Sequence, residues 1–508
     1  MKSYQSLLAG LLLACYSLTG RAQEKAVIAI SDTGHITINR NIYGQFAEHL
    51  GRCIYDGVYK DGKIRLDVVA ALKKIQVPLL RWPGGCFADQ YHWRDGIGDP
   101  KLRPQTVNTQ WGMVTEDNSF GTTEFMQLCK LIGCEPYVAG NMGTGSPQEM
   151  KDWIEYLNFG GKSTLADLRK SNGQAEPYHV KFWGVGNESW GCGGRMTPED
   201  YANKYREFAA FCKNYPGSPL RKMVSGANAD DYHWTQVVMS NIPLYLMQGI
   251  GVHYYCSADN EFGHGAATNF NEEQYFHAMK SALAIEDIIR GHTDIMDRYD
   301  PEKKVMLAVD EWGISLAPEP GTNPNFLYQQ NSLRDALIAA STLNIFNNHC
   351  DRIRMANLAQ AVNVLQALVL TKGDQMLLTP TYHVFDLYKV HQDATWLPVK
   401  LQCPNYNYQY ESIPEVNVSA SKDSNGVIHV SLVNLDAHQS IAVTAGLGLI
   451  QAKTISGEIL TSAHFSDINT FAQPDKIKLQ PFNGATLNAG RLQAELPPMS
   501  VVMLTLKP

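Results

Sequence analysis

The stretch KFWGVGNESWGCGG, residues 181–194, changes abruptly from apolar to polar. Its first six residues are typical of a buried strand, Asn187 and Glu188 follow directly, and glycines dominate the rest. An ionisable carboxyl beside a buried strand costs free energy unless it is paired or reaches water. The stretch therefore favours a fold in which Glu188 emerges where a strand ends.

Short apolar runs of this kind alternate with longer amphipathic stretches from residue 41 to about residue 390. This alternation predicts repeated strand–helix units. Helices are predicted at residues 66–75, 123–132, 198–214, 271–299 and 332–347. Strands are predicted at residues 42–47, 77–81, 135–140, 181–186, 223–227, 250–255, 305–310 and 353–357.

Eight such units favour an α/β fold, a closed (β/α)8 TIM barrel, over residues 41–394. An open doubly wound sheet would give the same alternation, but a phosphate-binding glycine loop after the first strand is missing. Residues 395–508 instead alternate with period two, as in VNVSAS and VIHVSLVNL, which predicts a C-terminal antiparallel β-sandwich of jelly-roll type. We expect residues 23–40 to add strands to that sandwich.

The first 22 residues have the layout of a cleaved signal peptide, with Lys2, an apolar run and a small residue at Ala22. They predict an exported protein, periplasmic or extracellular. The alternative is a lipoprotein anchored to a membrane at Cys15. No later segment reaches the roughly 18 apolar residues of a membrane-spanning helix.

The net charge of −7 leaves no basic footprint for a nucleic acid, so a neutral or polar substrate fits better. Ten cysteines occur, and nine follow the signal segment without the paired spacing of zinc sites, so no metal site is predicted. An exported location would permit disulfides, but their connectivity does not follow from the sequence.

Reactive side chains in a parallel barrel gather at the carboxyl ends of the strands. Glu188 follows the fourth predicted strand and Glu311 follows the seventh, so the two carboxyls can face each other. A pair of carboxyls around one sugar acetal is the requirement for glycoside hydrolysis. Other polar groups at strand ends are Glu48, Arg81, Asn187, His253, Tyr255 and Gln360.

Simpler interpretations exist for each of these residues. Glu188 alone could begin a helix or form a surface ion pair, and Glu311 could form a buried ion pair with Arg81. His253 could be a core histidine with its hydrogen bonds satisfied. The tryptophans near strand ends could stack on sugars but more often pack in a core, and no base is spaced to activate a cysteine nucleophile.

Seven motifs, in order, closely resemble the α-L-arabinofuranosidases of glycoside hydrolase family 51, and the likeness runs from about residue 25 to the end. They are GQFAEHLGRCIYDGVY, LRWPGGCFADQYHWRDGIG, NSFGTTEFM, WGVGNESWG, VHYY, VDEWG and MANLAQAVNV. The resemblance implies a retaining, exo-acting enzyme that needs no cofactor, with Glu188 as general acid/base and Glu311 as nucleophile. It places Glu48, Arg81, Cys86, Asn187, His253, Tyr255 and Gln360 at or near the substrate.

The expected substrate is an arabinofuranosyl group on hemicellulose, pectin or their oligosaccharides, and the family resemblance implies a homo-oligomer. Some family members carry Asn where this chain has Cys86. The same barrel and carboxyl pair would also suit a β-xylosidase or an endo-β-glucanase. A sugar-binding protein on an inactive scaffold is the alternative outside enzymes, and the presence of both carboxyls argues against it.

Overall fold

The computed structural model describes residues 25–259, 261–448, 450, 452–488 and 490–508. The predicted signal segment and Cys15 lie outside the described residues. Eight parallel strands close into a barrel in the order β10-β11-β12-β13-β2-β5-β8-β9. Their bounds are β2 Gly44–Phe46, β5 Leu79–Trp82, β8 Glu135–Gly140, β9 Phe182–Val185, β10 Arg221–Asn228, β11 Gly249–Cys256, β12 Met306–Ile314 and β13 Ile353–Ala359. Each contains or overlaps a predicted strand.

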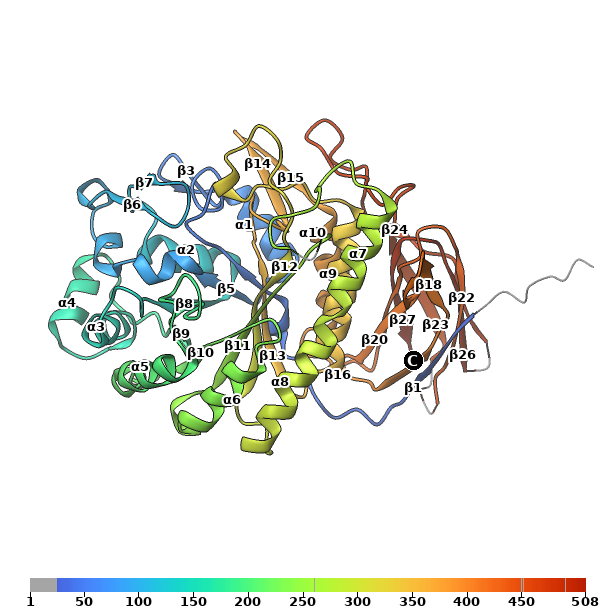
Figure 1. Cartoon of the computed structure of the whole chain (residues 1–508), viewed down its shortest axis with the longest axis horizontal. Coiled ribbons are helices and arrows are strands. Elements are labelled where there is room, and N and C mark those ends of the chain that lie inside the picture. Colours follow the sequence, from blue (N-terminus) through green and yellow to red (C-terminus); the bar gives the residue numbers. More distant parts are fainter. Residues whose placement is uncertain (1–24, 260, 449, 451, 489) are drawn as a thin grey trace, which may run out of the picture.

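The barrel interior is filled by apolar side chains that the strands point inward, including Leu79, Tyr137, Phe182, Met223 and Met306. Helices surround the barrel (Figure 1). Their bounds are α1 Leu66–Lys74, α2 Thr122–Ile132, α3 Pro147–Asn158, α4 Thr164–Ser171, α5 Pro198–Phe211, α6 Tyr232–Asn241, α7 Glu272–Leu283, α8 Ile285–Tyr299, α9 Leu333–Asn348 and α10 Pro380–Tyr388. This layer of helices buries the outer face of the sheet.

The helix predicted over residues 271–299 is two helices, α7 and α8, that meet at Ala284. The Ala284 N–H bonds the carbonyls of Lys280 and Ser281, so the last turn of α7 tightens there. A run of amphipathic residues gives no sign of such a break, because Ala284 is itself a strong helix former.

The remaining long strands form two sheets that pack face to face. One sheet has the order β17-β1-β22-β26-β25 and the other β16-β20-β21-β27-β23-β24. The bounds are β1 Lys25–Ile30, β16 Thr395–Trp396, β17 Val399–Gln402, β20 Val416–Lys422, β21 Ile428–Asn434, β22 Ile441–Gly446, β23 Thr454–Leu460, β24 Gln480–Pro481, β25 Ala485–Asn488, β26 Arg491–Leu496 and β27 Ser500–Lys507. Side chains from both sheets share one apolar core.

Strand β1, drawn in blue in Figure 1, lies among the red strands of this sandwich, as the fold prediction requires. It alternates exposed and buried residues, and its buried side chains Ala26, Ile28 and Ile30 join the sandwich core. Its pairing with β17 is antiparallel, whereas its pairing with β22 is parallel. The predicted class, a TIM barrel with a C-terminal β-sandwich, is confirmed.

Helix α9 lies between the barrel and the sandwich, and its side chains are buried from Leu333 to Asn347. Asn344 Oδ1 accepts hydrogen bonds from the hydroxyls of Ser419 and Ser431, at 2.8 and 2.6 Å. Asn347 Nδ2 donates to Ser419 Oγ at 3.1 Å. The two parts are therefore joined through buried polar groups as well as apolar packing. Within the described part of the chain, no helix has the length and apolarity needed to cross a membrane.

Candidate active site

The polar residues predicted at strand ends converge at one end of the barrel. Glu48 follows β2, Arg81 lies in β5, and Asn187 and Glu188 follow β9. His253 and Tyr255 lie in β11, Glu311 in β12, and Gln360 directly after β13. One carboxylate oxygen of Glu188, one of Glu311 and one ring nitrogen of His253 lie within 4.8 Å of one another. The closed barrel thus brings together carboxyls that are 123 residues apart in the sequence.

Glu311 is held by two donors. Arg81 Nη1 donates to its Oε2 at 2.8 Å, and the Tyr255 hydroxyl donates to its Oε1 at 2.7 Å. The Arg81 side chain is only 2% exposed and also donates to Asn187 Oδ1 and to the Asp310 carbonyl. A buried guanidinium in contact with a carboxylate favours the ionised form of that carboxylate. The two donors therefore fix the orientation of the Glu311 carboxyl, and Arg81 places a positive charge beside it.

Glu188 has a different environment. Its backbone φ is +39°, a conformation that few non-glycine residues adopt, and Gly191 and Gly193 donate to its carbonyl. Burial raises the pKa of Glu188, and the nearby charge of Glu311 raises it further, while a hydrogen bond from His253 lowers it. The raised pKa favours a protonated Glu188 beside an ionised Glu311, the division of roles that a retaining glycosidase needs.

His253 lies between three carboxyl groups, those of Glu188, Glu311 and Asp310. Its Nδ1 lies 2.9 Å from Glu188 Oε1 and 3.5 Å from Glu311 Oε2, and its Nε2 lies 3.4 Å from Asp310 Oδ1. Burial alone would lower the pKa of His253, but Glu311, Asp310 and Glu188 together raise it to about 10. The surrounding acids therefore favour the protonated imidazole, which would donate from Nδ1 toward Glu188 Oε1.

Both carboxyl oxygens of Glu48 accept hydrogen bonds, four in all among the described residues. Its Oε1 accepts from the backbone N–H groups of Gly85 and Phe87 and from Trp111 Nε1, at 2.9 to 3.0 Å. Its Oε2 accepts from Gln360 Nε2 at 3.0 Å. Burial raises the pKa of Glu48 to about 7. Glu48 thus fixes the loop after β5 and the Gln360 amide on the wall of the site.

A cavity of about 300 Å³ opens over these groups. Six predicted site residues line it: Glu48, Cys86, Glu188, Tyr255, Glu311 and Gln360. Arg81, Asn187 and His253 are each at most 6% exposed: Arg81 contacts Glu311, His253 contacts Glu188, and Asn187 accepts a hydrogen bond from Arg81. Trp111 and Trp190 complete part of the wall, while Trp82, Trp93 and Trp312 are buried in the apolar core. The volume is at the small end of ligand-binding pockets, which suits one sugar ring.

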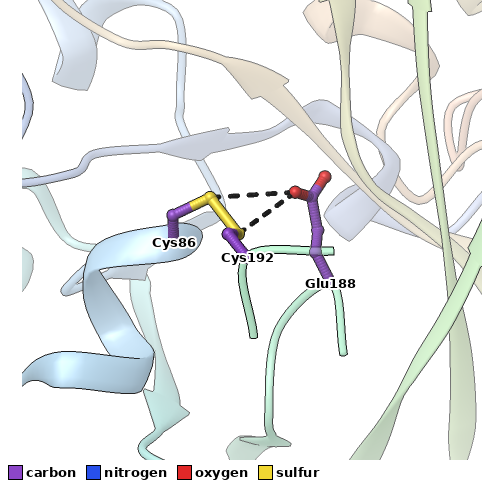
Figure 2. A group of neighbouring side chains, drawn as sticks. All are labelled: Cys86, Glu188 and Cys192. Carbon is purple, nitrogen blue, oxygen red and sulfur yellow. Dashed lines mark hydrogen bonds between the residues drawn. A yellow bond between two sulfur atoms is a disulfide. The ribbon is translucent and has the colours of Figure 1, made fainter. Parts of the chain in front are cut away.

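Cys86 forms a disulfide with Cys192, which follows Glu188 in the glycine-rich stretch. Figure 2 shows the disulfide beside the Glu188 carboxyl: Oε2 lies 3.8 Å from the sulfur of Cys86 and 3.4 Å from that of Cys192. Disulfide sulfurs carry no hydrogen, so these are packing contacts and not hydrogen bonds. The two cysteines are 106 residues apart, and their pairing did not follow from the sequence.

Two further acids of the site were not predicted. Asp310 is buried and accepts from the Tyr137 hydroxyl at 2.8 Å. In a regular strand Asp310 and Glu311 would point to opposite faces, but the register of β12 against β13 shifts between Val309 and Trp312. The available signal was the acidic pair itself, since two adjacent carboxyls are rare in a fully buried strand.

Asp89 is the second. Its Oδ1 accepts from the N–H groups of Met142 and Gly143, and its Oδ2 accepts from the N–H of Asn187. It thereby ties together the segments that follow β5, β8 and β9. Burial raises the pKa of Asp89 to about 7.

Comparison with known proteins identifies the family. Residues 71–274 match the model of the α-L-arabinofuranosidase 1 domain, and residues 310–500 match that of the α-L-arabinofuranosidase C-terminal domain. A protein of Bacteroides ovatus named intracellular exo-α-L-arabinofuranosidase is 47% identical over the whole of both chains. The chain belongs to the α-L-arabinofuranosidases of glycoside hydrolase family 51. It is a glycoside hydrolase, as predicted.

Solved structures of the family share the fold. The family 51 arabinofuranosidase of Xanthomonas axonopodis pv. citri is 45% identical, with a TM-score of 0.94 over 96% of this chain and 100% of that one. The α-L-arabinofuranosidase of Thermotoga maritima, solved as an arabinose complex, is 28% identical, with a TM-score of 0.84 over 96% and 100% of the two chains.

The predicted export of the protein is wrong. The Bacteroides ovatus relative, which matches this chain over its full length, is named as an intracellular enzyme. The export prediction depended on the composition of residues 1–22, and these lie outside the described residues. A single lysine followed by an apolar run does not by itself establish a signal peptide.

Proposed function

We propose that the protein hydrolyses terminal, non-reducing α-L-arabinofuranosyl groups with retention of anomeric configuration. The observation that carries the proposal is the carboxyl pair: oxygens of Glu188 and Glu311 lie within 4.8 Å of each other on the wall of one small cavity. Retaining glycosidases have carboxyls about 5 to 5.5 Å apart, whereas inverting enzymes need about 6.5 to 9.5 Å. This separation fits the retaining class, in which the second carboxyl attacks the anomeric carbon directly and forms a covalent intermediate.

In the first step Glu311 attacks the anomeric carbon while Glu188 protonates the departing glycosidic oxygen. The C–O bond to the leaving group breaks as the bond to Glu311 forms, and the leaving group departs as an alcohol. Since His253 occupies Glu188 Oε1, we place the transferred proton on Oε2, which lies beside the disulfide. The hydrogen bonds from Arg81 and Tyr255 stabilise the negative charge of Glu311 and fix the orientation of its carboxylate.

In the second step Glu188, now a carboxylate, takes a proton from water as that water attacks the anomeric carbon. The bond to Glu311 breaks and arabinose is released with its original configuration. The His253 cation stabilises the Glu188 carboxylate between the two steps. The resting charges are thus restored after each turnover.

The test is substitution of each carboxyl with a chromogenic arabinofuranoside as substrate. We expect Glu188→Ala to lower kcat for poor leaving groups by about 10² to 10⁴-fold, and azide to restore turnover as an azide adduct of retained configuration. Glu311→Ala should remove turnover while sugar binding remains. An inverted product, or wild-type turnover after either substitution, would contradict the proposal.

A second experiment, which varies the substrate, distinguishes an arabinofuranosidase from other retaining glycosidases. A panel of aryl furanosides and pyranosides, with NMR detection of the first anomer released, should show arabinofuranosides as preferred substrates. Preference for xylopyranosides or cleavage inside a glucan chain would favour a β-xylosidase or an endo-β-glucanase. We propose arabinose side chains of hemicellulose or pectin as the natural source of the substrate.

We also propose that the protein is a homo-oligomer, as the family resemblance implies. Large apolar side chains are exposed at Val107, Met113 and Val114, on the hairpin of β6 Thr106–Asn108 and β7 Val114–Glu116. Exposed apolar clusters of this kind are often covered by a partner. Light scattering should give a mass above the 56.5 kDa of one chain, and a single-chain mass would contradict this.

A further inference from the structure

The Cys86–Cys192 disulfide lies against the oxygen of Glu188 that the mechanism uses to carry its proton. Cys86 begins the short helix Cys86–Gln90 after β5, and Cys192 belongs to the glycine-rich stretch after β9. The sulfurs and Glu188 Oε2 all lie within 4.8 Å of one another, and Cys86 and Glu188 face the cavity. The mechanism assigns no chemistry to either sulfur.

We propose that the reduced form of this protein binds Zn²⁺ through Cys86, Cys192 and Glu188, and that the bound ion blocks the active site. Two thiolates and one carboxylate are a donor set that zinc accepts, and a water or substrate oxygen can take the fourth position. The open side faces the cavity, since Cys86 and Glu188 both line it. The disulfide then keeps the acid/base free of metal.

The distances fit this donor set. Zinc–sulfur bonds of about 2.3 Å and zinc–oxygen bonds of about 2.1 Å in a tetrahedron put sulfur and oxygen about 3.6 Å apart. Glu188 Oε2 already lies 3.8 Å from the Cys86 sulfur and 3.4 Å from the Cys192 sulfur. Only the two sulfurs must separate, to about 3.8 Å, once the bond between them is gone.

Asn187 lies beside the proposed ligands and contacts the Cys192 sulfur. Asn187 Nδ2 lies 3.9 Å from the Cys192 sulfur, and its Oδ1 is fixed by Arg81. A donor held beside a thiolate stabilises its charge and orients it as a ligand. The carboxyl is equally restrained, because His253 holds the other oxygen of Glu188.

The reduction balances with either a phosphine or a dithiol as reductant. A phosphine takes an oxygen atom from one water molecule to become a phosphine oxide, and the two hydrogens of that water end on the two thiols. A dithiol supplies two electrons and two protons, so the S–S bond becomes two thiols and the dithiol closes to its own disulfide. Zinc binding then releases the two thiol protons and the proton held on Glu188 Oε2. The ion occupies Glu188 Oε2, which can no longer protonate a leaving group. This inhibition rests on the proposed role of Glu188, whereas zinc binding does not.

The test uses the full chain in two forms, air-oxidised and reduced by a phosphine that is removed before measurement. Zn²⁺ alone is titrated by calorimetry, and bound metal is counted after dialysis. The cysteines that are free in the described residues are common to both forms, so the difference between the two forms reports Cys86 and Cys192. We expect one additional zinc ion per chain after reduction, with loss of turnover that a chelator reverses.

Cys192→Ser is the decisive variant, and Cys403→Ser, at a free cysteine of the sandwich, is its matched control. Loss of a direct ligand should weaken zinc binding by more than the roughly 10 to 100-fold that loss of an outer partner costs. The control should bind like the reduced wild type. Equal zinc binding in the oxidised and reduced wild type would overturn the proposal, as would unchanged binding in reduced Cys192→Ser. Zinc bound at this site without loss of turnover would instead contradict the role of Glu188.

Discussion

The proton on Glu188 is positioned by its two neighbours. Oε1 lies 2.9 Å from Nδ1 of His253, and Oε2 lies beside the disulfide, while Glu188 lines the cavity. An imidazolium can only donate, so the acid proton is held on Oε2, where a glycosidic oxygen can reach it. His253 thus determines which oxygen of Glu188 carries the proton, although His253 is not among the described residues that line the cavity.

The pH dependence of turnover follows from the same neighbours. Glu188 must be protonated to act as an acid, and its pKa is raised chiefly by burial. Activity should therefore persist above the ordinary pKa of a glutamate, about 4.3, and fall as the pH rises through the raised pKa. The measurement is kcat/KM against pH. With an activated aryl substrate, Glu188→Ala should lack this alkaline fall, and its persistence would assign the fall to another group.

Removal of one donor from Glu311 gives a second prediction. Tyr255→Phe deletes the 2.7 Å hydrogen bond to Oε1 and leaves the ring in place. A hydrogen bond to a charged group contributes about 1.5 to 3 kcal/mol, so kcat/KM should fall by about 10 to 150-fold. Tyr254→Phe is the control, because that hydroxyl donates to the Ser281 carbonyl instead. Equal losses in both variants would mean that the effect is structural.

Single residues differ in how far the sequence predicts them. Glu188 and Glu311 could be predicted, because each follows a predicted barrel strand and each lies in a motif that resembles the family. Asp310 could not, because strand alternation directs it away from Glu311 and only a shift of register brings both inside. The Cys86–Cys192 bond was also beyond prediction, since the two segments meet only after the barrel closes.

At the scale of elements, the loops that carry the site depend on one another through Asp89. This buried carboxyl accepts backbone hydrogen bonds from the segments after β8 and β9 and itself belongs to the segment after β5. The position of Asn187, and with it that of Glu188, is therefore coupled to two neighbouring loops.

Asp89→Asn should destabilise this arrangement. An amide has only one oxygen, so its NH₂ group must face at least one of the three backbone donors. A buried donor left without an acceptor costs about 1 to 3 kcal/mol, measured as the free energy of unfolding in urea. Asp294→Asn, on the exposed side of α8, is the matched control. Equal stability of the two variants would mean that the fold does not need both oxygens of Asp89 as hydrogen-bond acceptors.

Elements were predicted best where the pattern is local. The eight barrel strands are short apolar runs bounded by glycine or polar residues, and each contains its own signal. The break between α7 and α8 has no such signal at Ala284, because the tightened turn is a matter of backbone geometry. The pairing of β1 with the sandwich needed only its period-two pattern and its place before the barrel.

At the scale of the whole molecule, the barrel and the sandwich share a buried polar seam along α9 and the segment after α10. His391 lies in this seam: its Nδ1 is 2.7 Å from Ser421 Oγ and its Nε2 is 3.1 Å from Ser431 Oγ. Burial lowers the pKa of His391 to about 3. The ring is therefore neutral in the folded protein over most of the acidic range.

Acid should weaken the molecule through this histidine. Below pH 6.5 the unfolded chain binds a proton at His391, whereas the folded chain does not until about pH 3. His391 alone should thus contribute a fall of about 1.4 kcal/mol in the unfolding free energy per pH unit as the pH decreases through this window, and the buried His292, His383 and His429, whose pKa values are also lowered, add to it. Urea denaturation between pH 6 and pH 4.5 measures the slope. His391→Gln should be less stable at pH 7 but show a shallower slope, whereas His35→Gln, exposed before the barrel, should match the wild type. An unchanged slope in His391→Gln would place the acid sensitivity elsewhere.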